Sequence, residues 1–275
     1  MLGQPGNPIS KIPNPKSKRR LDTLIVERGL AESRARAQAL VMAGEVLVNG
    51  NRADKPGMPV PADAEIEVKA ALPYVSRGGL KLVHAVEAFG LGQCIRGKVA
   101  LDIGASTGGF TNVLLQEGAA RVYAVDVGTN QLAWKLRQDP RVVSLEQTNI
   151  RYLDSLPELA DLATADVSYI GLELVTPVAA RLTTPDAFMV VLIKPQFEAG
   201  REQVGKGGVV RDPQVHRDVI RRLAERWREQ DLHLAGLTRS PITGPAGNIE
   251  YLALLEKAPS AQVFDLEEAI ETVTG

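Results

Sequence analysis

The sequence predicts an α/β protein: a mostly parallel, seven-stranded sheet covered by helices, preceded by a small α+β domain. Short apolar segments alternate with helical periodicity over about 180 residues, which is the pattern of a parallel sheet with helices on both faces. Upstream of that region, about 50 residues are typical of two short helices followed by short strands. The 275 residues are 44% hydrophobic and 24% charged, a composition that excludes wholesale disorder.

The composition also excludes several classes of protein. The longest uninterrupted apolar run, residues 187–193, is too short to cross a bilayer, and the first ten residues lack the apolar segment of a secretory signal. The single cysteine, Cys94, has no internal disulfide partner, and three scattered histidines offer no zinc cluster. We therefore expect a cytoplasmic protein with no structural metal and no membrane partner.

Positive charge is concentrated at the start of the chain. The net charge of the whole chain is −1, yet the first 36 residues carry eight Lys or Arg against three acidic residues. A basic end of this kind suggests a local anionic partner, and nucleic acid is the first choice. Residues 1–18 are rich in proline and lack apolar periodicity, so we expect a disordered basic leader there.

The segment 19–69 forms the predicted small domain. Apolar residues at helical spacing from Leu21 predict a first helix, and Ser33 is suited to cap a second helix over 34–43. An Asn-Gly turn then follows a short strand, and a further strand is expected at 65–69. Cations and free backbone N–H groups at the start of the second helix are suited to phosphate oxygens. The predicted nucleic-acid contacts of this domain are Arg19, Arg20, Arg34 and Arg36.

A linker and the sheet domain follow. Residues 70–79, which contain Pro73 and a Gly-Gly pair, are the expected linker, and a new helix from Leu80 opens the domain at 80–275. Strands are expected at residues 99–103, 122–127, 142–145, 162–167, 188–193, 233–239 and 251–255. Helices are expected between most of them, at residues 109–117, 132–137, 174–182 and 213–230.

A glycine-rich turn after the first strand of the sheet predicts a nucleotide-like site, because glycine lets the backbone turn sharply and approach a ligand. The turn departs from the spacing of dinucleotide sites, since Ser106 takes the place of the second glycine. Asp102 just before it would favour a cationic ligand. Asp126 is suited to ribose hydroxyls and Asn149 to an adenine edge. The predicted S-adenosylmethionine site is Asp102, Gly104, Ala105, Ser106, Thr107, Gly108, Gly109, Phe110, Asp126 and Asn149.

Four polar residues are expected to meet beside that site. Asp166 and Lys194 each follow an apolar strand, and ligands bind beyond the carboxyl ends of the strands in sheets of this class. Glu250 opens the last strand, and Lys81 begins the helix that leads into the sheet. Two amines and two carboxylates at one place can handle the proton of a hydroxyl nucleophile. Lys194 would act either as the base or as a cation that stabilises a developing alkoxide.

The segment SRARAQALVMAGEVLVNG (33–50) resembles the S4 RNA-binding domain. From about Arg19 to Glu256 the chain resembles the TlyA family, ribosomal RNA 2′-O-methyltransferases in which an S4 domain precedes an FtsJ-like, Rossmann-like methyltransferase domain. The motifs that carry the resemblance are YVSRGGLKL (74–82), LDIGASTGGFT (101–111), ADVSYI (165–170), LIKPQFEAG (192–200), VGKGGVVRDP (204–213) and GNIEYL (247–252). The FtsJ-like tetrad Lys-Asp-Lys-Glu falls on Lys81, Asp166, Lys194 and Glu250. The resemblance implies S-adenosylmethionine as methyl donor and cytidines of ribosomal RNA, free or in ribosomal subunits, as substrate.

The segment 198–213 is rich in glycine and is interpreted as a mobile flap that contacts RNA phosphate. The predicted RNA contacts of the sheet domain are Arg77, Arg201 and Lys206. A second hypothesis is an RNA-binding ribosome-assembly factor with a methyltransferase-like fold and little activity. The haemolysin label attached to the family suggests a lytic toxin, but no long apolar segment or strongly cationic amphipathic helix supports that function.

Overall fold

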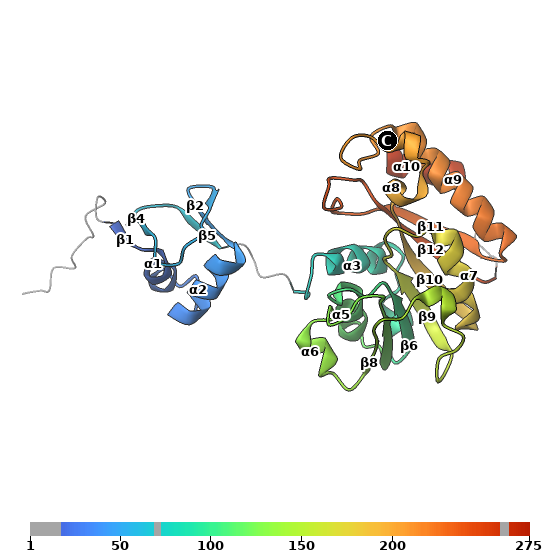
Figure 1. Cartoon of the computed structure of the whole chain (residues 1–275), viewed down its shortest axis with the longest axis horizontal. Helices are drawn as coiled ribbons and strands as arrows, with labels where there is room; N and C mark the ends of the chain where they lie inside the picture. Colours follow the sequence, from blue (N-terminus) through green and yellow to red (C-terminus); the bar gives the residue numbers. More distant parts are fainter. Residues whose placement is uncertain (1–17, 69–72, 259–263) are drawn as a thin grey trace, which may run out of the picture. The chain divides into compact units, whose positions relative to one another are not determined.

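The computed structural model describes residues 18–68, 73–258 and 264–275, which divide into two compact units after Pro73 (Figure 1). Residues 1–17 of the predicted leader, Lys69 at the end of the predicted small domain, and residues 70–72 at the start of the predicted linker lie outside the described residues. Lys18, which was expected in the disordered leader, is instead the first residue of a strand. No helix among the described residues is long and apolar enough to span a membrane.

The first unit is the small α+β domain expected from the sequence. Its elements are β1 (Lys18–Arg20), α1 (Leu21–Glu27), α2 (Arg34–Ala43), β2 (Val46–Val48), β3 (Asn51–Arg52), β4 (Pro59–Pro61) and β5 (Ile66–Val68). The Ser33 hydroxyl caps α2 by accepting from the Arg36 N–H at 3.2 Å, as predicted. Asn49 and Gly50 both have positive φ, which is the backbone of the tight turn that an Asn-Gly pair predicts. A core around Leu21, Ile25 and other apolar side chains holds the two helices on the strands.

The second unit is built on one seven-stranded sheet, as predicted, in the order β11-β12-β10-β9-β6-β7-β8. The strands are β6 (Val99–Ile103), β7 (Arg121–Val125), β8 (Val142–Leu145), β9 (Ala160–Ala165), β10 (Thr183–Ile193), β11 (His233–Arg239) and β12 (Tyr251–Glu256). Only β12 among the described strands of this sheet runs against the others, because it pairs antiparallel with both of its neighbours. Strand β10 starts five residues before the expected position and contains an irregularity between Thr183 and Phe188.

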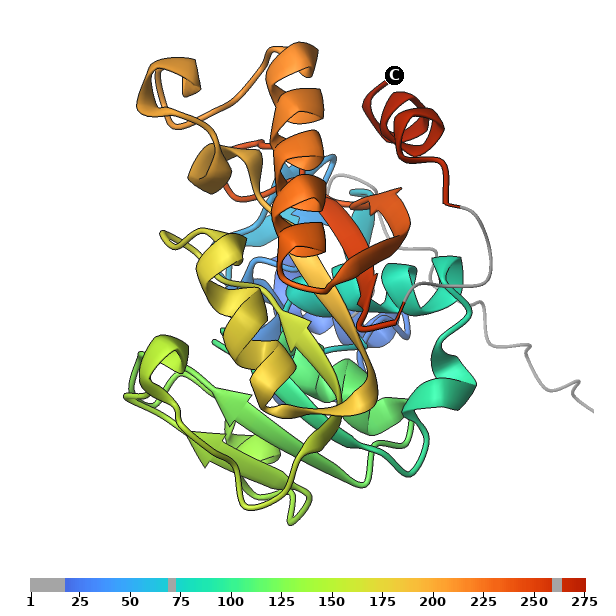
Figure 2. The same cartoon turned by 90° about the vertical axis from the view of Figure 1, so that its right-hand side faces the viewer.

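Helices cover both faces of this sheet. They are α3 (Gly78–Ala88), α4 (Gly92–Ile95), α5 (Gly109–Gln116), α6 (Trp134–Arg137), α7 (Leu172–Arg181), α8 (Pro195–Glu198), α9 (Pro213–Glu229) and α10 (Leu266–Thr274), with the 3-10 helices η1 (Ile150–Tyr152) and η2 (Arg201–Gln203). Helices α3 and α5 lie over one face, and α7 and α9 over the other (Figures 1 and 2). Successive side chains of β10 point to opposite faces of the sheet, and both faces are apolar. Met189 and Val191 belong to one apolar cluster, and Val190 and Leu192 belong to the other.

Helix α3 begins two residues earlier than expected, so Gly78 and Gly79 belong to a helix and not to the linker. A Cβ on Gly79 would lie 2.4 Å from Cγ of the Tyr74 ring. The Val75 N–H donates to Asn112 Oδ1 of α5 at 3.1 Å. These contacts hold the segment before α3 against the second unit. The Gly-Gly pair, which predicted a linker, gives no indication of this packing.

The strand order determines which side chains meet. Ile103 of β6 pairs with Ala165 of β9, and Ala165 pairs with Val191 of β10, so the carboxyl ends of these parallel strands lie next to each other. Because β12 is reversed, its first residue, Tyr251, pairs with Ile193 at the end of β10. The reversal therefore brings the segment before β12 to the same edge of the sheet.

Candidate functional site

Two cavities adjoin at this edge of the sheet. The first, of about 700 Å³, is lined by Lys81, Asp166, Lys194 and Glu250, and is named the tetrad cavity here. The second, of about 680 Å³, is named the Asp126 cavity after the carboxylate that lines it and not the first cavity. Both cavities are lined by Gly104, Ser106, Asp166, Ser168 and Tyr169. Groups bound in the two cavities would therefore meet beside Asp166.

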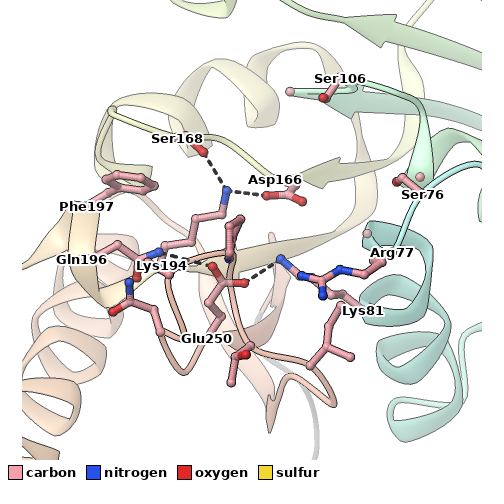
Figure 3. Close-up of a pocket in the computed structure, with 18 of the residues that line it drawn as sticks. Ser76, Arg77, Lys81, Ser106, Asp166, Ser168, Lys194, Gln196, Phe197 and Glu250 are labelled. Carbon is pink, nitrogen blue, oxygen red and sulfur yellow. Dashed lines mark hydrogen bonds and ion pairs between the residues drawn. The ribbon is translucent and has the colours of Figure 1, made fainter. Parts of the chain in front are cut away.

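The four predicted tetrad residues form two close ion pairs in the tetrad cavity (Figure 3). Lys194 Nζ lies 2.6 Å from Asp166 Oδ1, and Lys81 Nζ lies 2.6 Å from Glu250 Oε2. The lysines are only 7–8% exposed and Glu250 is 1% exposed. Charges that are this well shielded need partners, and each lysine has one.

The structure adds residues to this group that reasoning from the sequence missed. Lys194 Nζ donates a second hydrogen bond, to Ser168 Oγ at 2.9 Å, and lies 5.8 Å from the centre of the Phe197 ring. Gln196 Nε2 donates to Glu250 Oε1 at 3.3 Å (Figure 3). All three residues stand two or three positions after a tetrad residue, so a search for polar and aromatic neighbours around Asp166 and Lys194 would have found them.

The contacts of Lys194 determine what it can do to a bound group. An ammonium has three N–H donors, and the contacts with Asp166 and Ser168 occupy two of them. The third is available to an oxygen that enters the tetrad cavity. A shielded cation beside such an oxygen stabilises negative charge as it develops there.

Asp102 lies near the end of β6, beneath the glycine-rich turn. It is completely buried and lines neither the tetrad cavity nor the Asp126 cavity. Its carboxylate accepts hydrogen bonds from Thr111 Oγ1 at 2.6 Å and from Thr164 Oγ1 at 2.9 Å. Burial raises the pKa of Asp102 to about 6. Both carboxylate oxygens accept hydrogen bonds that join β6 to α5 and β9 beneath the turn, and the contact of Asp102 with a ligand stays a prediction.

The glycine-rich turn borders the tetrad cavity, with the exception of one residue. The lining residues are Gly104, Ala105, Ser106, Thr107, Gly109 and Phe110. Gly104 has φ +79°, and a Cβ there would come within 2.5 Å of the Asp166 carbonyl oxygen, so the turn requires glycine. Gly108 does not line the cavity; a Cβ there would overlap the side chains of Leu132 and Leu136. Gly108 is therefore a packing position against the α6 segment.

The Asp126 cavity contains both of the remaining predicted cofactor residues. Asp126 accepts from the N–H groups of Ser106 at 2.8 Å and Gly128 at 2.7 Å, which holds its carboxylate at the cavity wall. The side chain of Asn149 caps η1 by accepting from the Arg151 N–H at 3.1 Å. Apolar side chains complete the lining, namely Ile103, Val125, Val127, Ile150, Val167, Ile170 and Leu174. A carboxylate beside apolar walls suits a ligand with a diol and a flat ring.

The predicted RNA contacts fall into two groups. In the first unit, Arg36 is exposed and Arg19 is ion-paired with Glu27. Arg20 and Arg34 both contact Asp22, a buried acid that the sequence did not single out.

The three predicted RNA contacts of the second unit do not lie at one place. Arg77 lines the tetrad cavity at the start of α3 (Figure 3). Arg201 and Lys206 are exposed and line neither large cavity. The 198–213 segment that carries them is anchored near its end, because the Val210 N–H donates to Asn248 Oδ1 at 3.0 Å.

Comparison with known proteins divides the chain in the same way. Residues 74–257 match the FtsJ-like methyltransferase family and residues 19–66 match the S4 domain. The 16S/23S rRNA (cytidine-2'-O)-methyltransferase TlyA of Mycobacterium tuberculosis is 46% identical over 259 residues, which cover 91% of this chain and 95% of that protein. Hemolysin A of Brachyspira hyodysenteriae is 41% identical over 237 residues, covering 85% and 98%. A solved structure of a Streptococcus thermophilus protein, 46% identical, aligns with a TM-score of 0.71 and covers 93% and 95%.

Proposed function

The chain belongs to the FtsJ-like methyltransferase family and carries an S4 domain ahead of the methyltransferase domain, and from this premise we propose that it methylates a ribose 2′-hydroxyl of ribosomal RNA. The observation that carries the proposal is the pair of shielded Lys–carboxylate contacts in the tetrad cavity, which shares a wall with the Asp126 cavity. The tetrad cavity then takes the target nucleotide, and the Asp126 cavity takes the nucleoside part of the methyl donor.

The residues of the Asp126 cavity fit S-adenosylmethionine. The Asp126 carboxylate suits the two ribose hydroxyls, and the apolar side chains around it suit an adenine ring. The glycine-rich turn, which borders both cavities at Gly104 and Ser106, suits the amino-acid end. When bound, the sulfonium supplies an electrophilic methyl group.

Lys194 acts on the nucleophile in this proposal. Its contacts with Asp166 at 2.6 Å and Ser168 at 2.9 Å hold the ammonium in place, and its third N–H donates to the ribose 2′-oxygen. As the oxygen attacks the methyl group, the fixed positive charge stabilises the charge that builds on the oxygen, and the hydroxyl proton passes to the Asp166 carboxylate, which lines the same cavity. Glu250, held by Lys81 and Gln196, keeps the opposite wall in position. The shielded cavity requires that the target nucleotide leave its stack, as in other enzymes that act on a single nucleotide.

The target RNA follows from the S4 domain and from the relatives. The TlyA relative is named for the cytidine 2′-oxygen of 16S and 23S rRNA, which supports cytidines of both ribosomal RNAs, free or within subunits, as substrates. A protein with that substrate works where ribosomes are, in the cytoplasm.

The test is Lys194→Ala in the full-length protein. We expect the variant to bind S-adenosylmethionine normally by isothermal titration, because Lys194 does not line the Asp126 cavity. Transfer of labelled methyl groups to ribosomal RNA should fall by at least about 100-fold, the scale of losing one preorganised charge at a reacting oxygen.

Lys98→Ala is the matched control, since Lys98 forms a half-exposed ion pair with Asp161 away from both cavities. Turnover retained by Lys194→Ala would contradict the assignment of the tetrad. A wild-type protein that binds RNA but not S-adenosylmethionine would support the ribosome-assembly factor instead.

A further inference from the structure

Asp22 is a buried acid at the centre of a polar cluster in the S4 domain. Its side chain is completely buried at the first turn of α1. Asp22 Oδ1 accepts from Arg20 Nε at 3.0 Å, and Oδ2 accepts from Arg20 Nη2 at 2.8 Å. Oδ2 also accepts from Arg34 Nε at 3.0 Å and from Gln38 Nε2 at 2.9 Å. One carboxylate thus joins the end of β1, the start of α2 and the middle of α2.

The two arginines keep donors for an external anion. The side chains of Arg20 and Arg34 are 51% and 56% exposed, although the acid between them is closed from solvent. Arg20 uses Nε and Nη2 toward Asp22, and Arg34 uses Nε alone. The remaining N–H groups of these planar forks make no hydrogen bond to Asp22. Phosphate is an anion that such forks bind in two parallel hydrogen bonds.

Gly57 makes room for this arrangement. A Cβ at that position would lie 2.8 Å from Nη2 and 2.9 Å from Nη1 of Arg20. The guanidinium of Arg20 is therefore packed against the backbone on one side and bonded to Asp22 on the other. An exposed arginine is normally free to adopt many rotamers, and binding an anion costs the entropy of fixing one.

We propose that Asp22 is a positioning residue that presents Arg20 and Arg34 as one preorganised subsite for the phosphate backbone of RNA. The proposal rests on the proposed function, since it takes RNA as the ligand of the S4 domain. Asp22 itself does not touch the RNA. Because it is negative, a purely electrostatic view predicts that its removal strengthens RNA binding. A positioning role for Asp22 predicts that its removal weakens RNA binding. A single substitution of Asp22 by a neutral residue therefore distinguishes the two explanations.

The experiment measures the affinity of the full-length protein for a ribosomal RNA fragment that the wild type methylates, over a series of salt concentrations. Asp22→Asn is expected to bind about tenfold more weakly, because the two guanidinium groups lose their common anchor. The plot of log binding constant against log salt concentration should have a shallower slope, by the amount that corresponds to the loss of about one to two phosphate contacts. Asp54→Asn, which removes a charge that is 80% exposed in the same domain, is the matched control and should bind at least as tightly as the wild type.

A second variant tests the proposal if Asp22→Asn does not fold, and a double variant tests whether the effect depends on the two arginines. Gly57→Ala leaves Asp22 in place but displaces the guanidinium of Arg20, and it is expected to weaken binding several-fold. In an Arg20→Ala/Arg34→Ala background, Asp22→Asn or Gly57→Ala should have almost no additional effect on affinity.

Three outcomes overturn the proposal. The first is a folded Asp22→Asn or Gly57→Ala protein that binds RNA as tightly as the wild type. The second is an equal loss of affinity from Asp22→Asn or Gly57→Ala whether or not the two arginines are present. The third is a wild type that neither binds nor methylates ribosomal RNA, which overturns the proposed function as well, whereas the first two leave the proposed function standing.

Discussion

Both units of this chain place acids against basic side chains, and the two clusters differ in which partner is buried. Around Asp22 the acid is closed from solvent while the side chains of Arg20 and Arg34 are about half exposed. In the tetrad, the lysines and Glu250 are all shielded. Exposed cations on a buried acid form a surface that an extended polyanion can reach. Shielded pairs in a cavity act only on what enters it, where charge interactions are strongest.

A third buried acid sharpens the contrast. Asp22 and Asp102 are both completely buried, but Asp102 accepts hydrogen bonds from the hydroxyls of Thr111 and Thr164, where Asp22 accepts them from two arginines. The hydrogen bonds from Arg20, with smaller contributions from Gln38 and Arg34, hold the pKa of Asp22 well below its usual value. Desolvation raises the pKa of Asp102 to about 6. Burial alone therefore does not determine the charge state of an acid, because the partners decide it.

The largest expected effect comes from breaking a shielded pair in the tetrad. Lys81→Met leaves the Glu250 carboxylate buried with only the Gln196 amide as a partner. We expect the free energy of unfolding of the methyltransferase domain to fall by about 3–5 kcal/mol in urea denaturation. The double variant Lys81→Met/Glu250→Gln should recover most of that loss, since it removes the unpaired charge. A double variant as unstable as the single one would contradict this account.

An intermediate effect is expected from Asp102→Asn, and it depends on pH. The folded protein holds the Asp102 proton more tightly than the unfolded chain, because the pKa is about 6 in the fold and about 4 when unfolded. Protonated Asp102 therefore contributes to the free energy of unfolding of the wild type. That contribution is fully present below about pH 4 and is lost as the pH rises to about 6.

The measurement is urea denaturation of the wild type and Asp102→Asn across this pH range. Relative to the variant, the wild type should lose roughly 2–3 kcal/mol between pH 4 and pH 6.5. A difference between the two proteins that does not change with pH would show that Asp102 titrates normally.

The smallest effect is expected at the Asp22 cluster, where a cation is exposed. Arg34→Ala removes one hydrogen bond to Asp22, but Arg20 and Gln38 still hold the carboxylate. The free energy of unfolding of the S4 domain should fall by only about 1 kcal/mol. Thermal denaturation of Arg34→Ala beside Arg36→Ala, a neighbouring exposed arginine on the same helix, provides the comparison. A loss as large as that of Lys81→Met would remove the distinction between the two clusters.

Much of the fold was predictable because it follows from local patterns. Apolar strands alternating with helical segments predicted the seven-stranded sheet, and Ser33 before a helix predicted its cap. Local patterns did not reveal what packing between distant segments decides. The sequence shows only that Asp102 stands before a glycine-rich turn, whereas the fold shows that Thr111 and Thr164 enclose it beneath that turn.

The sequence by itself determined the types and order of the functional groups: an acid or a lysine at the end of each of several strands, and basic residues at the start of one short helix. The tertiary structure alone decided that Lys81 pairs with Glu250, since the two residues stand 169 positions apart along the chain. It also decided that β12 is reversed, which carries Glu250 to the edge where Lys194 ends its strand. The physical reason is that side-chain identity sets which charges are available, whereas burial and distance, which exist only in the folded chain, set which of them interact.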